Sequence, residues 1–232
     1  MTKGCPIYLI IMTISIRWLG HSSFQINVDE KVIYLDLYRS KQLRERVPDD
    51  LDPATLVLTT HSHNDHCFPE AINEVRNSET TIIAPADCSD KLGAAITSLT
   101  PGEETQVEGI KIKAVHAYNV KRFRSPGNPY HPKGFGVGYL ISADNKTIYF
   151  AGDTDVIPEM KELGPIDVAL LPCGDTYTMD NKDAAEATAI IKPKIVVPMH
   201  TWDKSIDDFK RRVEKETDTE FRYLKEGESF SI

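Results

Sequence analysis

Apolar and polar positions along the chain divide it into two runs of short strands, with helical segments between and after them. Alternating apolar residues predict half-buried strands, and a short unbroken apolar run predicts a buried one. In the first run, strands are expected at 13–18, 24–28, 31–36, 55–58 and 81–84. A charged surface loop is expected at 41–52, a helix starting near Cys67, and another helix at 87–95.

The second run repeats the strand pattern and then changes character. Further strands are expected at 104–107, 110–115, 137–142, 147–151, 221–224 and 229–232. The unbroken apolar segments 168–171 and 195–199 predict central strands buried on both faces, and 182–191 and 204–216 have helical spacing. Two β-sheets with helices outside account for this order, so the predicted fold class is α+β, with an approximate break near Gly109.

Composition and charge restrict the kind of partner. The chain has 232 residues, enough for one large domain with a well-buried core. Its formal net charge of −8 argues against nucleic-acid binding, because a phosphate-binding surface needs clustered Lys and Arg. A local basic patch remains at Lys121, Arg122 and Arg124, within the segment 121–135. We expect this segment to be a long ordered loop, and loops of that length are usually functional or disordered.

Six consecutive residues, His61-Ser62-His63-Asn64-Asp65-His66, follow the expected strand at 55–58, and four of them can bind a metal. His61 and His63 are two positions apart, so an extended chain points both side chains to one side. Asp65 and His66 come after the turn and approach the same space from elsewhere. The pattern suits two divalent ions held close together. Imidazole and carboxylate ligands favour zinc, with manganese or iron as alternatives.

At these residues the chain resembles the metallo-β-lactamase superfamily, whose signature is H-x-H-x-D-H. Matching motifs follow the same order along the chain: Gly20-His21-Ser22-Ser23-Phe24, Ala151-Gly152-Asp153-Thr154-Asp155, the stretch 171–180, and Pro198-Met199-His200. Together they are similar to small cytoplasmic metal-dependent hydrolases related to the L-ascorbate-6-phosphate lactonases. The resemblance covers nearly the whole chain from Thr13 on. It implies a four-layer αβ/βα sandwich with the metals at one edge of the two sheets.

The resemblance also implies two further metal ligands. Asp153 would bridge both metals, which leaves Asp155 to cap a helix near Ile157, since Asp is favoured at that position. His200, at the end of the segment 195–199, would bind the second metal. Each of these residues follows an expected strand.

The third histidine of the first metal site is left open by the sequence. His116 is favoured because it ends an alternating strand, which fixes its position. His131 is the second candidate, and Asn119 marks the position at which a relative could carry the ligand. Whichever of His116 and His131 is not a ligand is expected to face the substrate. His21 is expected either to line the site as a hydrogen-bond partner or to be a turn residue.

These residues predict a metal-dependent hydrolase. Two metals would lower the pKa of a shared water and yield hydroxide at neutral pH, and Asp65 would orient it or take its proton. The expected substrate is a small anionic ester or lactone, whose charge would meet His131, Lys133 and the basic patch. The alternatives are a phosphodiesterase or nuclease, and a metal-binding protein without turnover. Oxygen reduction at two irons would need a flavin domain, for which the chain has no room.

The N-terminal stretch and the cysteines indicate the cellular compartment in which we expect the protein. The apolar stretch 6–12 is shorter than the ~20 residues that span a bilayer and lacks a signal-peptide cleavage site. We therefore expect 1–11 to be an extension before the native start and 12–232 to be one domain. An extra edge strand or a membrane-surface anchor is the alternative for 1–11. Cys5, Cys67, Cys88 and Cys173 are expected to be free thiols, so we expect a cytoplasmic protein, either a monomer or a homo-oligomer.

Overall fold

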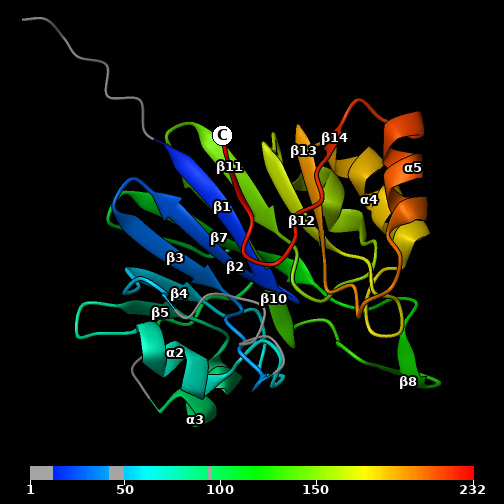
Figure 1. Ribbon diagram of the computed structural model, residues 1–232. Helices are drawn as coiled ribbons and strands as arrows, with labels where there is room; N and C mark the ends of the chain where they lie inside the picture. The colour runs from blue at the N-terminus through cyan, green and yellow to red at the C-terminus, as the bar shows by residue number, and fades with distance from the viewer. Residues whose placement is uncertain (1–12, 42–49, 94–95) are drawn as a thin grey trace, which may run out of the picture.

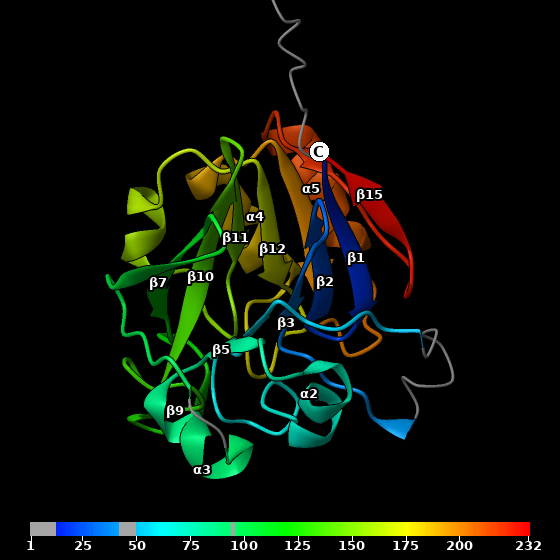
Figure 2. The same ribbon diagram turned by 90° about the vertical axis from the view of Figure 1, so that its left-hand side faces the viewer.

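A computed structural model describes residues 13–41, 50–93 and 96–232. Two β-sheets pack face to face, and helices cover their outer sides (Figures 1 and 2). The expected extension at 1–11 lies outside the described residues, as does most of the loop expected at 41–52. Within the described ranges, no helix is both long enough and apolar enough to cross a membrane.

The first sheet is built mostly from the N-terminal part of the chain, in the order β15-β1-β2-β3-β4-β5. Its strands are β1 (Ile14–Gly20), β2 (Ser23–Val28), β3 (Lys31–Leu35), β4 (Leu56–Leu58), β5 (Thr81–Ile83) and β15 (Ser229–Ser231). Strands β1 to β3 are antiparallel neighbours, whereas β3, β4 and β5 run parallel. The C-terminal strand β15 pairs with β1, so the first and last described strands are neighbours in one sheet.

The second sheet has the order β14-β13-β12-β11-β10-β7-β6. Its strands are β6 (Glu104–Val107), β7 (Ile110–Ala117), β10 (Gly136–Ala143), β11 (Lys146–Phe150), β12 (Val168–Pro172), β13 (Ile195–Met199) and β14 (Glu220–Phe221). The two strands predicted to be central, β12 and β13, lie side by side in parallel, and β12 is buried along its whole length.

The break between the two sheets falls before Glu104 and not near Gly109, so that prediction is wrong. Glu108 and Gly109 have φ values of 47° and 85° and form the turn between β6 and β7. Two successive positive φ angles match the right-handed twist of a tight β-hairpin. Gly109 therefore joins two neighbours within one sheet.

The helices lie where apolar residues must be covered. Those that the described residues form are α2 (Pro69–Val75), α3 (Ser89–Leu92), α4 (Asn181–Ile191) and α5 (Asp207–Glu216), with 3₁₀ turns η1 (Ala86–Cys88) and η2 (Pro158–Glu162). Ala71, Ile72 and Val75 of α2 pack in one core with Val57 and Ile82 of the first sheet. A larger core fills the space between the sheets and reaches α4 and α5. These four layers confirm the predicted αβ/βα sandwich.

Two local predictions needed adjustment. The helix expected at 87–95 is a 3₁₀ turn followed by the four-residue α3, which ends at Gly93 in the left-handed region (φ 54°). The long loop expected at 121–135 contains a small hairpin, β8 (Phe123–Ser125) with β9 (Asn128–Pro129), which Figure 1 shows at the lower right. The three described cysteines are buried free thiols, as expected.

Candidate metal centre

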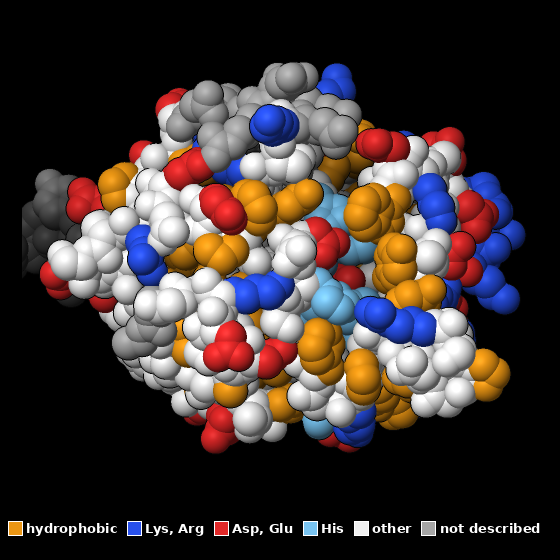
Figure 3. All heavy atoms as spheres, turned by 90° about the horizontal axis from the view of Figure 1, so that it is seen from below, with side chains coloured by type: hydrophobic (Ala, Val, Ile, Leu, Met, Phe, Trp, Pro, Cys, Tyr) orange, Lys and Arg blue, Asp and Glu red, His pale blue; other side chains and the backbone are white. Residues whose placement is uncertain are grey.

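The six-residue motif forms a turn that follows β4 at one edge of the two sheets. Seen from that edge, histidine and acidic side chains lie in a hollow ringed by hydrophobic and basic side chains (Figure 3). Close packing of the backbone keeps the edge compact. A Cβ on Gly152 would lie 2.9 Å from the Val137 carbonyl oxygen and 3.1 Å from Thr60 Cβ. Glycine at this position, with a φ of 63°, therefore lets the segment after β11 reach the motif.

Two main groups of potential ligand atoms lie side by side at this edge, and within each group the atoms are no more than 4.8 Å apart. The first group is His61, His63 and His131, and the second is His21, Asp65, His66 and His200. In the first group, His63 Nδ1 is 3.0 Å from His61 Nε2 and 3.2 Å from His131 Nε2. Three ring nitrogens that converge in this way suit a metal ion.

Asp153 lies between the two groups. Its Oδ2 is 3.3 Å from His131 Nε2 and 3.3 Å from His200 Nε2. Its Oδ1 is 3.4 Å from His66 Nε2, and Asp153 also forms a third potential ligand group with His61 and His66. One buried carboxylate thus contacts both main groups, which is the arrangement that a bridging ligand requires.

Polar atoms without a hydrogen-bond partner gather at the same place, and they test whether the residues fit a metal. His66 Nε2, His200 Nε2 and Asp153 Oδ1 are buried and unpartnered. An unsatisfied buried polar group costs about 1–3 kcal/mol, so three of them together indicate a cation that they would coordinate. Imidazole nitrogen and carboxylate oxygen are donors that suit zinc, manganese and iron.

The protonation states agree with this. Burial lowers the pKa of His21 and of His131 to about 4, so both are neutral near pH 7. Burial alone would raise the pKa of Asp153, but His200 and His66 hold that pKa well below its usual value. Burial would lower the pKa of His66, but Asp153 and Asp36 raise it well above its usual value. The carboxylates thus favour positive charge at His66, and a bound metal ion would place such a charge beside them.

Asp36, which the sequence did not single out, orients two of the histidines. Its Oδ2 accepts a 2.6 Å hydrogen bond from His66 Nδ1. The Thr60 backbone N–H and hydroxyl donate to its two oxygens at 2.7 Å each. Because the Thr60 hydroxyl donates its hydrogen bond to Asp36, its oxygen can only accept from His61 Nδ1, which lies 3.0 Å away. Both rings therefore turn Nε2 toward the site. The available signal was an acidic residue directly after an apolar strand.

His131, not His116, lies beside His61 and His63, so the prediction that favoured His116 is wrong. His116 lies on β7 and lines a separate cavity of about 250 Å³ together with residues of η2. The physical reason is that the chain after β7 folds back on itself. Asn119 N–H donates to the His131 carbonyl, and the Asn119 side chain accepts from the His131 backbone N–H, both at 2.8 Å. Asn119 itself therefore holds a ligand-group histidine and does not join the group.

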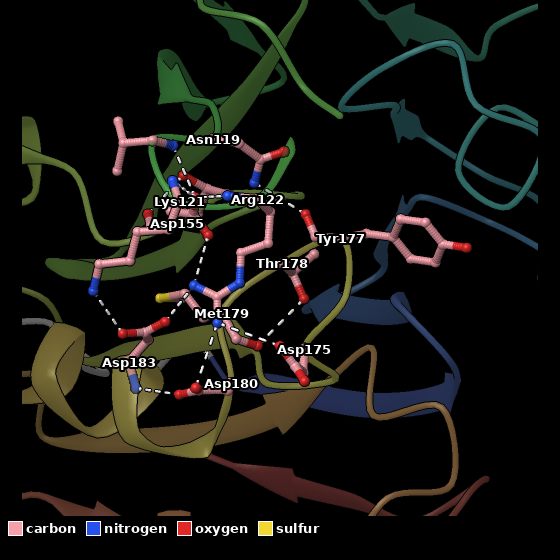
Figure 4. A network of polar contacts seen from close by, with 12 residues as sticks. Asn119, Lys121, Arg122, Asp155, Asp175, Tyr177, Thr178, Met179, Asp180 and Asp183 are labelled. Carbon is pink, nitrogen blue, oxygen red and sulfur yellow. Dashed lines mark hydrogen bonds and ion pairs between the residues drawn. The ribbon is translucent and has the colours of Figure 1, made fainter. Parts of the chain in front are cut away.

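We expected Asp155 to cap a helix near Ile157, and it does not. The 3₁₀ turn η2 begins after Ile157 without a side-chain cap. The Asp155 carboxylate instead accepts the backbone N–H groups of Val120, Lys121 and Arg122 at 2.8, 2.7 and 3.2 Å (Figure 4). The loop that carries Asn119 is thereby fixed to the segment that carries Asp153.

His21 belongs to the second group. Its Nε2 is 3.1 Å from Asp65 Oδ2, and its ring centroid is 4.2 Å from that of His200. His21 and His200 both have left-handed backbone, with φ values of 52° and 51°, and His200 N–H donates to the His21 carbonyl. Such backbone is strained in residues other than glycine and gathers at functional sites.

The family described as "Beta-lactamase superfamily domain" matches residues 15–200. The chain belongs to the metallo-β-lactamase superfamily. A UPF0173 metal-dependent hydrolase from Pelotomaculum thermopropionicum is 32% identical over 228 residues, which cover 94% of this chain and 99% of that protein. One from Methanopyrus kandleri is 31% identical over 229 residues, covering 93% and 98%.

Solved structures agree with the family. A crystal structure described as that of a metal-dependent hydrolase from Parabacteroides distasonis is 34% identical, covers 94% of each chain, and has a TM-score of 0.82. Igni18, a metallo hydrolase from Ignicoccus hospitalis, is 26% identical with a TM-score of 0.76, and covers 95% of this chain and 98% of that one. The further likeness to the L-ascorbate-6-phosphate lactonases stays a prediction.

Proposed function

We propose that this superfamily member is a two-metal hydrolase of small anionic esters or lactones. The observation that carries the proposal is that two adjoining groups of ligand atoms share one buried carboxylate, Asp153. Its oxygens lie 3.3–3.4 Å from ring nitrogens of both groups. A binder of a single ion would have no use for this duplication.

The residues divide into those that would hold the ions and those that would act on water. His61, His63 and His131 would hold one ion, Asp65, His66 and His200 the other, and Asp153 both. When bound, two divalent ions supply a water of lowered pKa and polarise the bond to be cleaved.

Asp65 and His21 would manage the proton of the attacking water. The Asp65 side chain is 27% exposed whereas that of Asp153 is 4% exposed, so Asp65 is the carboxylate that faces the opening. His21 Nε2 contacts Asp65 Oδ2 at 3.1 Å and fixes its orientation. Asp65 would thus accept the proton at Oδ1 or orient the water, as a positioned general base does.

A metal-defined activity screen tests the proposal. The chain is stripped with a chelator, reloaded with zinc or manganese, and offered lactones, carboxylic esters, thioesters and phosphodiesters while bound metal is counted. We expect two metals per chain and turnover of anionic esters or lactones that chelation abolishes. A maximum of one metal rejects the two-metal centre. Two metals without turnover favour a binding protein, and turnover confined to phosphodiesters favours a phosphodiesterase.

A further inference from the structure

The basic residues near the site are mostly committed to carboxylates. Lys121 Nζ is 2.8 Å from Asp183 Oδ1, and Arg122 pairs with both Asp155 and Asp183 (Figure 4). Lys133 Nζ is 2.7 Å from a Glu159 oxygen. The basic patch that the sequence predicts is therefore largely neutralised by carboxylates within the protein.

Arg124 is the exception in that loop. Among the described residues it has no carboxylate within 4.0 Å, and its guanidinium lies over the Tyr130 ring, 5.3 Å from the centroid. Tyr130 directly precedes His131 of the first ligand group, so this arginine lies near the metal ligands. An exposed arginine in this position has its donors available for an anion.

Aromatic side chains continue from Arg124 along one side of the centre. The Tyr130 and Tyr177 rings pack edge to face with their centroids 4.8 Å apart, and the centroids of Tyr177 and Trp202 are 6.3 Å apart. Trp202 in turn contacts His21 at 4.8 Å, also edge to face. Tyr177 is 38% exposed and Trp202 is 49% exposed. Figure 3 shows such hydrophobic side chains around the hollow that holds the histidines.

The two loops that carry Tyr177 and Trp202 have strained backbone and pack closely against each other. Asp175 and Thr176, which precede Tyr177, have φ values of 62° and 57°, and Trp202 has a φ of 51°. A Cβ on Gly174 would overlap the His200 carbonyl and lie 2.9 Å from Trp202 Cδ1. Strained backbone persists where the surrounding structure demands it, and here it holds two large rings in solvent. The Tyr177 ring points away from the carboxylate network in Figure 4.

We propose that Arg124, Tyr130, Tyr177 and Trp202 form a substrate-recognition subsite for a flat aromatic or heteroaromatic group that carries an anionic substituent. The inference rests on the proposed function, because it assigns the substrate of that same site. Arg124 binds the carboxylate or phosphate through paired donors. The rings, set at angles of 88° and 60° to their neighbours, offer faces and edges for an aromatic partner.

Binding of product-like probes tests the subsite without requiring turnover. Zinc-loaded protein is titrated with benzoate and with phenylphosphonate. Binding is followed by calorimetry and by the fluorescence of Trp202, which is one of two tryptophans in the chain. Cyclohexanecarboxylate lacks the aromatic ring, and benzamide lacks the charge. We expect each of them to bind at least about tenfold more weakly than benzoate. The ratio of the benzoate and phenylphosphonate affinities tells which anion the subsite prefers.

The decisive variant is Arg124→Ala, with Lys111→Ala as its control. Lys111 is an exposed residue of β7 and pairs with Glu104 of the neighbouring strand β6, so the control removes the same charge elsewhere. We expect Arg124→Ala to weaken benzoate or phenylphosphonate about tenfold with bound zinc unchanged, and Lys111→Ala to have no effect. Trp202→Ala, followed by calorimetry, is expected to weaken benzoate more than cyclohexanecarboxylate.

The outcomes separate the subsite from the proposed function. Arg124-dependent binding of aromatic anions without any hydrolysis would retain the subsite and reject the hydrolase. Hydrolysis of anionic alkyl esters or lactones, with unchanged kinetics in Arg124→Ala, would reject the subsite and retain the hydrolase. Equal affinity of wild type and Arg124→Ala for both probes overturns the inference. If both proposals hold, Arg124→Ala raises KM for anionic aryl esters and leaves kcat close to wild type.

Discussion

Asn119 holds His131 through a single side-chain oxygen, because Oδ1 accepts from the His131 backbone N–H at 2.8 Å and from Nδ1 at 2.9 Å. A backbone N–H can only donate, so the Asn119 amide cannot be turned the other way. The Asn119 Nδ2 group meanwhile donates to the Tyr177 carbonyl at 3.0 Å. His131 Nδ1 must therefore carry the proton, and the lone pair of Nε2 faces His63 and Asp153. Asn119 thus fixes the metal-binding tautomer of His131 without help from a metal ion.

Replacing Asn119 with Ala is therefore expected to weaken zinc binding about 10- to 100-fold, the usual cost of losing a group that orients a metal ligand. Competition with a chromogenic chelator measures the affinity. Asn73→Ala, at an exposed position of α2, is the matched control and should bind zinc like wild type. Unchanged affinity in Asn119→Ala would show that packing alone fixes the His131 ring.

His131 and His116 should respond differently to removal. His131→Ala takes one of three converging nitrogens from the first group, so we expect the metal count to fall toward one per chain. His116→Ala leaves both groups intact and should retain two metals. Elemental analysis after dialysis against dilute zinc measures both variants. Loss of metal from His116→Ala alone would contradict the assignment.

Asp36→Asn should weaken metal binding at the second group although it replaces none of the ligand residues. All three partners of the Asp36 carboxylate, His66 Nδ1 and the two Thr60 groups, donate hydrogen bonds. An asparagine keeps one acceptor oxygen and turns its NH₂ toward a donor, leaving a buried group unpaired. We expect a 10- to 100-fold loss of zinc affinity and a lower free energy of unfolding, measured by urea denaturation. Asp29→Asn, on the exposed turn after β2, should do neither.

Arg122→Ala should destabilise the fold more than Arg124→Ala, although both arginines lie in the same loop. The Arg122 side chain is 10% exposed, and its loss leaves the buried carboxylates of Asp155 and Asp183 without their shared cation. Removing one partner of a buried ion pair typically costs about 3–5 kcal/mol. Among the described residues Arg124 has no carboxylate partner, so its removal should change the free energy of unfolding by less than about 0.5 kcal/mol. Urea unfolding of the metal-free proteins compares them.

Much of this protein could be predicted from local sequence alone. The apolar periodicity located the strands of both sheets, because which side chains face the core depends on spacing along a strand. The compact motif from His61 to His66 indicated the metal centre, since four ligand side chains within one turn can reach a common point without help from distant segments. The structure places Asp153 and His200 beside that motif, as the family resemblance implied.

Other features were decided by contacts between segments far apart in the chain. Strand geometry favoured His116, but hydrogen bonds between Asn119 and His131 place His131 in the first group. A basic patch was expected from Lys121 to Arg124, yet Asp155 and Asp183 neutralise most of it and leave Arg124 available. Hydrophobic spacing shows which residues are buried. It does not show which polar partners meet across a loop, because that depends on how the folded backbone places donors and acceptors.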